Sequence, residues 1–153
     1  MKKEDICFMS ACEMAEKIKT QELTSQEIIE TIIERIQKIN TIINAYCTPT
    51  LELAREMAKE ADEREKEGKK LGTLFGSKIF ENNKPRRDDI VVKRARDAGT
   101  VILGKTNTPA FGFKGETDNL IFGTTKNPWN LERTTGGSSG GAAGAVASGL
   151  GPI

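Results

Sequence analysis

The last part of the sequence, residues 134–153, carries no charge, although 29% of the chain as a whole is charged. It holds seven of the fifteen glycines. Its first half is a Gly/Ser-rich segment, TTGGSSGG, and an alanine-rich segment, AAGAVASG, follows directly. Small apolar residues favour a helix and pack closely against neighbouring elements. The segment therefore predicts a glycine-rich loop that leads into a buried helix, and it constrains the fold more than any other stretch of the chain.

Two other interpretations of this segment are weaker. A flexible Gly/Ser linker would not be expected to run into an alanine-rich helix. Gly137 and Gly141 have the small-xxx-small spacing of packed membrane helices. However, the many glycines, with Ser and Thr, leave too little apolar surface to drive insertion into a bilayer. We therefore expect no membrane association.

Composition excludes several classes of function. The 23 basic and 22 acidic residues give a net charge of +1, so no field of one sign predicts a nucleic-acid partner. No apolar run follows Met1, and the three cysteines lack metal-site spacing, which is typical of a cytoplasmic protein with reduced thiols. The chain has no histidine, which excludes Ser-His-Asp and Cys-His catalysis within it and removes the commonest metal ligand. We expect no metal site.

The first half of the chain is predicted to be mainly helical. Ser10 with Glu13 and Thr24 with Glu27 have the spacing of capping boxes, which mark helix starts. An isoleucine stripe follows the second box and runs to Asn40. The remaining elements expected in this half are a short extended segment, 43–48, and a third helix, 51–66, that stops at Gly68.

The second half has the pattern of an α/β protein. A helix is expected over 87–98, with two aspartates near its start and Gly99 at its end. Residues 100–103 are predicted to form a short apolar strand buried on both faces. A long turn-rich stretch without secondary structure, 107–135, then leads to the Gly/Ser loop, and connections of this length are usually functional. The order of helix, strand, long loop and helix indicates an α/β fold.

The segment from Gly99 to Thr106 matches the phosphate-loop pattern G-x-x-x-x-G-K-T. A phosphate loop lies between a strand and a helix, so that its backbone N–H groups surround the phosphates. Here the intervening residues are themselves the predicted strand, and Asn107 and Pro109 stand where the helix would begin. Nucleotide binding through this match is the weakest of the functional hypotheses.

The Gly/Ser loop has the composition of a catalytic loop. Glycines on both sides of Ser138 and Ser139 allow the backbone to approach a ligand, and the helix N-terminus that follows favours negative charge. A serine there could be a nucleophile, a proton relay or only a helix cap. Without histidine, its activation would need a neutral lysine or a second hydroxyl. Ser139 as a simple cap is compatible with a chemical role for Ser138.

The motifs of the chain, in their order and spacing, resemble the amidase signature family. The residues that carry the resemblance are Gly104-Lys105-Thr106-Asn107-Thr108-Pro109, Phe111-Gly112, Glu116-Thr117-Asp118-Asn119, Phe122-Gly123, Asn127-Pro128-Trp129 and Gly136-Gly137-Ser138-Ser139-Gly140-Gly141. Further N-terminal matches are Leu23-Thr24-Ser25, Ile39-Asn40, Asn44-Ala45-Tyr46 and Leu71-Gly72-Thr73-Leu74-Phe75-Gly76.

The resemblance implies a mixed sheet flanked by helices, of which this chain would be an incomplete N-terminal part. We expect a helical part at 1–70 and an α/β part at 71–153. The family hydrolyses carboxamide C–N bonds without metal or cofactor, through a Ser-Ser-Lys triad whose relay serine follows a cis peptide bond. By motif position Ser138 is the relay serine, and Gly136, Gly137 and Ser139 are substrate-binding positions.

The chain departs from the family pattern in three places. The family's nucleophilic serine lies in a second Gly-rich turn beyond the position of Ile153. The segment with the catalytic lysine is missing where Gly76 runs directly into Ser77, and neither Lys78 nor Lys105 has the flanking pattern of that lysine. Ala110 stands where the family commonly has Glu.

These departures predict that the chain is inactive by itself. Members of a catalytic triad act as a unit, so loss of one member costs several orders of magnitude in rate. The chain would then be a poorly folded amidase relative, or a fragment completed by another polypeptide or by a homo-oligomer. The resemblance leaves open whether the small-molecule amide substrate is that of a free amidase or of an amidotransferase subunit.

Overall fold

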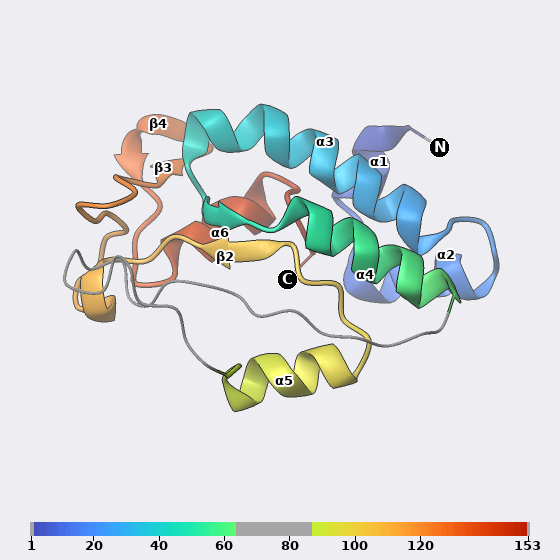
Figure 1. The fold of residues 1–153 in the computed structure, drawn as a ribbon. Coiled ribbons are helices and arrows are strands. Elements are labelled where there is room, and N and C mark those ends of the chain that lie inside the picture. The colour runs from blue at the N-terminus through green and yellow to red at the C-terminus, as the bar shows by residue number, and fades with distance from the viewer. Residues whose placement is uncertain (1, 64–86, 153) are drawn as a thin grey trace.

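A computed structural model describes residues 2–63 and 87–152 (Figure 1). Within these ranges the second half contains both helices and short strands, whereas the first half is mainly helical. The elements are α1 (Lys3–Cys7), α2 (Ala11–Lys19), α3 (Ser25–Ile43), β1 (Tyr46–Pro49), α4 (Leu51–Glu63), α5 (Ile90–Asp97), β2 (Gly104–Thr106), the 3₁₀ turn η2 (Ala110–Gly112), β3 (Lys126–Asn127), β4 (Asn130–Thr134) and α6 (Gly140–Ala147).

Both capping boxes are confirmed. Ser10 precedes α2, where its hydroxyl accepts a bond from the Glu13 N–H at 3.3 Å, and the Glu13 carboxylate accepts the Ser10 N–H at 2.8 Å. The same reciprocal pair joins Thr24 and Glu27 at the start of α3, at 3.1 and 2.8 Å. These bonds satisfy N–H groups that have no partner within the helix.

Helix α3 is longer than the isoleucine stripe predicted. It continues past Asn40 to Ile43 and ends at Asn44, which has the left-handed conformation with a φ of 52°. The Asn40 side chain instead holds the following strand: its Nδ2 donates to the Tyr46 carbonyl at 3.0 Å, and its Oδ1 accepts the Tyr46 N–H at 2.7 Å. Asn40 therefore fixes β1 against α3.

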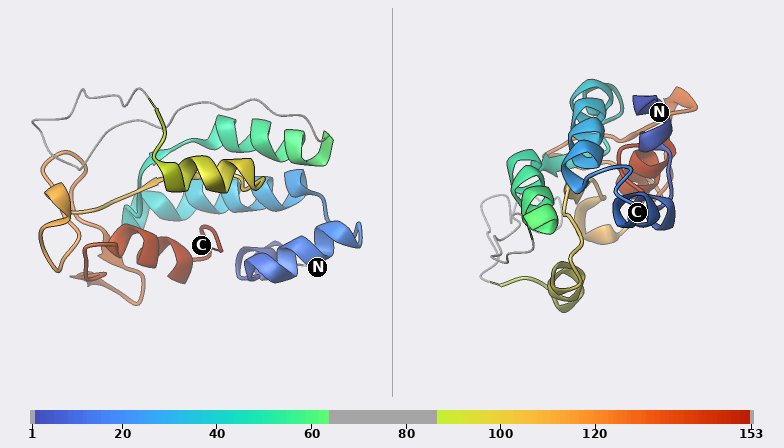
Figure 2. Two further views of the ribbon diagram at one scale, coloured as in Figure 1. Left: turned by 90° about the horizontal axis from the view of Figure 1, so that it is seen from below. Right: turned by 90° about the vertical axis from the view of Figure 1, so that its right-hand side faces the viewer.

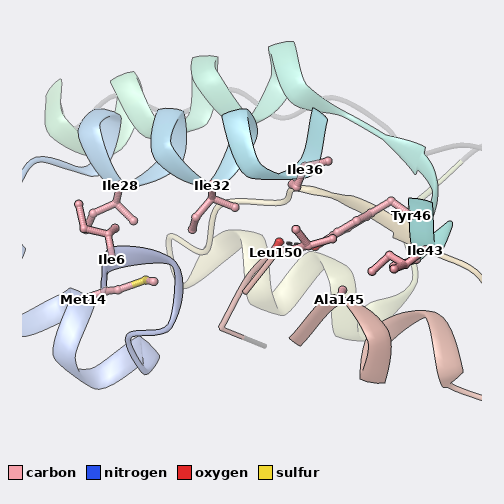
Figure 3. Close-up of a cluster of buried hydrophobic side chains, with 10 residues drawn as sticks. Ile6, Met14, Ile28, Ile32, Ile36, Ile43, Tyr46, Ala145 and Leu150 are labelled. Atoms are coloured by element: carbon pink, nitrogen blue, oxygen red, sulfur yellow. Dashed lines mark hydrogen bonds between the residues drawn. The ribbon is translucent and has the colours of Figure 1, made fainter. Parts of the chain in front are cut away.

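The core surrounds α3 on two sides. Figure 2 shows α3 between α4 on one side and α1 and α6 on the other. Ile33 of α3 is fully buried against Ala54 and Ala58 of α4. The larger cluster, drawn in Figure 3, joins the other face of α3 to α1, α2, β1 and the end of the chain; it contains Ile6, Met14, Ile28, Ile32, Ile36, Ile43, Ala45, Tyr46, Ala145 and Leu150. The N-terminal helices and the alanine-rich segment thus share one core.

The strands form two antiparallel pairs, β1 with β2 and β3 with β4, and the described residues contain no parallel pair. The prediction of a buried strand over 100–103 was wrong. Thr100 is exposed and residues 101–103 are half-buried, and the Ile102 and Leu103 carbonyls accept bonds from the hydroxyl and the N–H of Thr50 at 3.3 and 2.9 Å. Because these two carbonyls bond to Thr50, the residue just before α4, the segment forms no strand ladder. Strand β2 begins only at Gly104.

Helix α5 is shorter than the predicted span of 87–98. The Asp89 carboxylate accepts the Val91 N–H at 3.1 Å, so Asp89 is the cap and the helix begins at Ile90. It ends before Gly99, which has a φ of +86°, as expected for a helix terminator. The stretch 107–135 is not free of secondary structure, because it contains η2 and the β3–β4 hairpin.

Two expectations lie outside the described residues. These are the end of the third helix near Gly68 and the boundary between the parts 1–70 and 71–153. The loop-and-helix prediction for the uncharged segment is confirmed, because α6 follows the Gly/Ser loop and contacts β1 and β2. In the ranges 2–63 and 87–152, no helix has the length and apolar character needed to cross a membrane.

Candidate active site

The Gly/Ser loop meets the rest of the protein through two glycines at the start of α6. A Cβ on Gly140 would lie 2.3 Å from the hydroxyl oxygens of Thr117 and Thr135. A Cβ on Gly141 would lie 2.3 Å from the Asn107 nitrogen and 2.4 Å from its carbonyl oxygen. No side chain fits at such distances, so the start of α6 can pack against the two threonine side chains and the Asn107 backbone only with glycine at both positions.

One hydroxyl closes the loop. Thr117 Oγ1 donates to the Gly136 carbonyl at 2.8 Å and accepts the Gly140 N–H at 3.0 Å. Thr117 is fully buried, and its bond to Gly140 satisfies one of the free N–H groups of the α6 N-terminus. The five-residue segment from Gly136 to Gly140, with Ser138 at its centre, is therefore held at both ends by a single side chain.

The two serines of the loop differ in their surroundings. Ser139 occupies the cap position of α6, but its side chain makes no cap bond, and Thr117 caps the helix in its place. Ser138 is half-buried, Ser139 is exposed, and the Ser138 hydroxyl has no hydrogen-bond partner among the described residues. The peptide bond between Gly137 and Ser138 is cis, as the motif resemblance implies. Ser138 is thus the more enclosed of the two and keeps a free hydroxyl.

Asn107 is a hydrogen-bonding hub that connects the start of α6 to the surrounding loops. It is fully buried, and all its polar groups are used. Its Nδ2 donates to the Gly123 carbonyl at 3.0 Å and to the Thr125 hydroxyl at 3.1 Å, and its Oδ1 accepts Asn119 Nδ2 at 2.7 Å. On the main chain, its N–H donates to the Ala45 carbonyl at 2.8 Å and its carbonyl accepts the Gly141 N–H at 3.2 Å.

The same network reaches α3. The buried Thr125 hydroxyl donates to the Asn44 carbonyl at 2.7 Å, and Asn44 Nδ2 donates to the Phe122 carbonyl at 2.5 Å. The residue that ends α3 is therefore linked to the residue that supports α6. Sequence reasoning missed the roles of Asn107, Thr117 and Thr125. The sequence pattern that could have indicated them is a series of uncharged polar residues between turns. Surface loops have the same pattern, so it does not identify buried residues.

None of the hydrogen bonds described above brings Lys78 or Lys105, the lysines considered for the triad, next to Ser138. Lys78 lies outside the described residues, and Lys105 lies on β2 opposite Thr48. Next to it, burial raises the pKa of the Cys47 thiol, and the positive charge of Lys105 partly opposes this effect. In the described part of the chain, no group of three or more Cys, Asp or Glu residues is placed to hold a metal.

The phosphate-loop match does not have phosphate-loop geometry. Its last three residues form β2, which is paired with β1, and the described chain after Thr106 continues through irregular backbone to the 3₁₀ turn η2. A helix N-terminus, which a phosphate loop requires, does not follow it.

Residues 69–153, more than half of the chain, match the family model for amidases. The chain belongs to the amidase family. This confirms the family indicated by the motifs. Ser138, Asn107, Thr117 and Thr125 of this amidase chain lie within the matched residues.

Relatives with known names share the same family. The amidase chain is 39% identical to the A subunit of glutamyl-tRNA(Gln) amidotransferase from Carboxydothermus hydrogenoformans, over 95% of its own length and 34% of the relative. It is 38% identical to an acylamidase of Rhodococcus erythropolis over 100% of its own length and 36% of the relative. The chain therefore spans about a third of the length of the relatives it matches.

Solved structures show the same fold. A 6-aminohexanoate cyclic dimer hydrolase complexed with substrate superimposes with a TM-score of 0.83 at 34% identity, over 95% of this amidase chain and 33% of the hydrolase. A fatty acid amide hydrolase superimposes with a TM-score of 0.87 at 25% identity, over 98% of this chain and 30% of the other. The described elements are thus part of the amidase fold.

Proposed function

We propose that this chain supplies the relay serine, Ser138, to an amidase that hydrolyses carboxamide C–N bonds through a Ser-Ser-Lys triad. The observation that carries the proposal is the Thr117 bridge, which holds a loop at the start of α6 whose half-buried Ser138 hydroxyl has no partner among residues 2–63 and 87–152. Because the loop is held in place, a serine hydroxyl on it that is not otherwise hydrogen-bonded is available to pass a proton between a nucleophile and a base.

The neighbouring positions fit a substrate-binding role. The Gly136 carbonyl is one end of the Thr117 bridge, Gly137 follows it in the loop, and Ser139 is exposed next to Ser138. Without bulky side chains at these positions, an amide could approach the backbone closely. We propose that Gly136, Gly137 and Ser139 bind the substrate amide mainly through their main-chain groups.

The nucleophile and the lysine would come from residues outside these 153. The alignment with the Rhodococcus acylamidase extends over 172 residues although the chain has 153, which supports a deletion relative to that protein. By the family motifs, the deletion falls between Gly76 and Ser77. We infer that hydrolysis needs both the missing segment and the remaining two thirds of the fold.

A pair of chimeras tests the proposal. In the first, this chain replaces the matching third of the Rhodococcus acylamidase; in the second, that protein's own segment is also inserted between Gly76 and Ser77. We expect ammonia release from a simple primary amide by the second chimera only. Ser138→Ala in the second chimera should lower the rate by a factor of about 10³ or more, because triad members act as a unit.

Ser10→Ala is the matched control, because Ser10 is an exposed helix cap far along the chain from the loop. It should leave the rate within a few-fold of the parent chimera. Full activity of Ser138→Ala would remove Ser138 from the mechanism. Activity of the first chimera would show that the lysine is not missing.

A role within a multi-chain enzyme is a second candidate. It is favoured by the name of one relative, which is the A subunit of an amidotransferase. Isolation of the native protein under mild conditions, followed by mass spectrometry, should then recover a second polypeptide that carries the missing motifs. Recovery of this chain alone, as a catalytically inactive species, would contradict that role.

A further inference from the structure

A groove lies at the end of α6 opposite to Ser138. Its volume is about 330 Å³, and four segments distant in sequence form it: the end of α1, the second half of α3, the β3–β4 hairpin and the end of α6. The wall is mainly apolar and includes Phe8, Ile42, Trp129 and Leu131. In Figure 1 the β3–β4 hairpin lies beside the C-terminal part of α3, so two of the lining segments are neighbours in space.

The apolar residues of this groove are unusually accessible. Trp129 is 86% exposed, Phe8 57% and Leu131 46%, whereas the chain buries other large apolar side chains in α3. Single exposed apolar residues are common on protein surfaces, but a lined concave cluster of them marks a binding site.

Arg35 is the one charged residue that lines the groove, and it is held rigidly. Its Nε donates to the Ser148 carbonyl at 2.6 Å, and its guanidinium lies 4.8 Å from the centre of the Phe8 ring. Among the described residues its ion-pair partner is Glu4, at 3.9 Å, whose side chain is 74% exposed. The guanidinium is therefore oriented but weakly neutralised, which leaves a donor edge for an anion.

A second polar group lies at the same end. Ser148 lines the groove and is 6% exposed, and its hydroxyl is buried without a hydrogen-bond partner in the described residues. Buried hydroxyls are normally paired, so an unpaired one in the residue whose carbonyl orients Arg35 indicates an acceptor from outside the described residues. An oxyanion is an acceptor that suits both a guanidinium and a hydroxyl.

We propose that this groove binds an apolar monocarboxylate. The carboxylate would pair with Arg35 and accept from Ser148, and the hydrocarbon part would lie against Ile42, Trp129 and Leu131. A dication or a sugar has no counterpart in this wall, because its single charge is positive and the rest is apolar apart from Ser148. The site is separate from the loop of Ser138, since α6 runs between them.

The chain provides its own probe, because Trp129 is the only tryptophan. Titration with decanoate below its micelle concentration should shift Trp129 emission to shorter wavelength and saturate. Decanol, which has the same chain but no charge, should bind at least about tenfold more weakly, as expected when a charge-assisted hydrogen bond is lost.

Two arginine variants separate recognition of the carboxylate from non-specific hydrophobic binding. Arg35→Gln should weaken decanoate binding by about tenfold or more and leave decanol unchanged. Arg55→Gln is the matched control, since Arg55 pairs with Glu30 on another face and should change neither affinity. Circular dichroism checks that each variant is folded; should Arg35→Gln not fold, Arg35→Lys takes its place and should reduce the preference for decanoate over decanol.

Three results would overturn the proposal. They are the absence of a saturable shift with decanoate, equal affinity for decanoate and decanol, and unchanged decanoate binding in the folded Arg35 variant. An emission shift that follows protein concentration and not decanoate would show that a second copy of the chain occupies the groove, and would equally reject it.

Discussion

The Thr117 bridge makes a strong prediction about the stability of the Ser138 loop. Thr117→Val keeps the volume and the branched shape of the side chain, so it leaves no cavity in this fully buried position. It removes the bond to the Gly136 carbonyl at 2.8 Å and the bond from the Gly140 N–H at 3.0 Å. The variant thus tests the hydroxyl alone.

The expected loss follows from these two bonds. Each contributes about 1 kcal/mol net, and the buried Gly140 N–H left without an acceptor adds up to about 1 kcal/mol, so the free energy of unfolding should fall by about 2–3 kcal/mol. Urea unfolding followed by circular dichroism measures this directly. The midpoint should move to lower urea by about 1 M or more, with the slope unchanged.

Thr124→Val is the matched control, because Thr124 lies in the same stretch but is exposed. Its free energy of unfolding should stay within about 0.5 kcal/mol of the wild-type value. If Thr117→Val also stays within that range, the hydroxyl does not hold the loop, and Ser138 is not positioned through it.

Two further predictions concern single side chains and pH. Tyr46→Phe removes the 3.0 Å bond from the Tyr46 hydroxyl to the Leu150 carbonyl and should cost about 1 kcal/mol. Burial raises the pKa of Tyr46 to about 12, so the wild-type protein should lose stability as pH rises from about 10 through 12, and the variant should lose less in a urea series over that range. For Asp62, burial acts to raise the pKa, but bonds from the Gln26 and Ser25 N–H groups outweigh it and lower the pKa. Its contribution is therefore present above about pH 4 and lost as pH falls through the lower folded pKa. Asp62→Asn should cost about 1 kcal/mol at pH 7 and flatten this acid dependence; an unchanged acid profile would show that the Asp62 carboxylate does not stabilise the first N–H groups of α3.

Local rules predicted helix starts well. Ser10 and Thr24 begin their helices because the cap and its glutamate lie within one turn, so no distant contact can change the outcome. The same holds for the loop before α6, where glycine pairs and alanines are adjacent. Family membership also followed from local motifs, since their order along the chain survives without knowledge of the fold.

Long-range partners account for the errors. Residues 100–103 have the composition of a buried strand, but Thr50, far away in sequence, takes the carbonyls that a ladder would use. Asn40 looked like a helix end because asparagine often is one, yet its side chain pairs with Tyr46 and the helix continues. Which acceptor a polar group meets is decided by tertiary contacts, and pattern alone does not contain them.

Sequence reasoning named Ser138 as a candidate and missed the residues that hold its loop. Ser138 is named by its motif, whereas Thr117 and Asn107 are identified only by the bonds they make. Polar side chains in turns are usually on the surface, so nothing local separates these buried ones from solvent-exposed neighbours such as Thr124.

The hydrogen-bonded hub at Asn107 also determines which substitutions the chain can accept over time. In the isoleucine core of α3, one aliphatic side chain can replace another of similar volume at modest cost. Asn107 has no such substitute, because aspartate lacks the two donors and leucine lacks every polar atom that Gly123, Thr125 and Asn119 require. We therefore expect the aliphatic core positions of α3 to vary widely among related sequences, and Asn107 and its hydrogen-bond partners to vary very little.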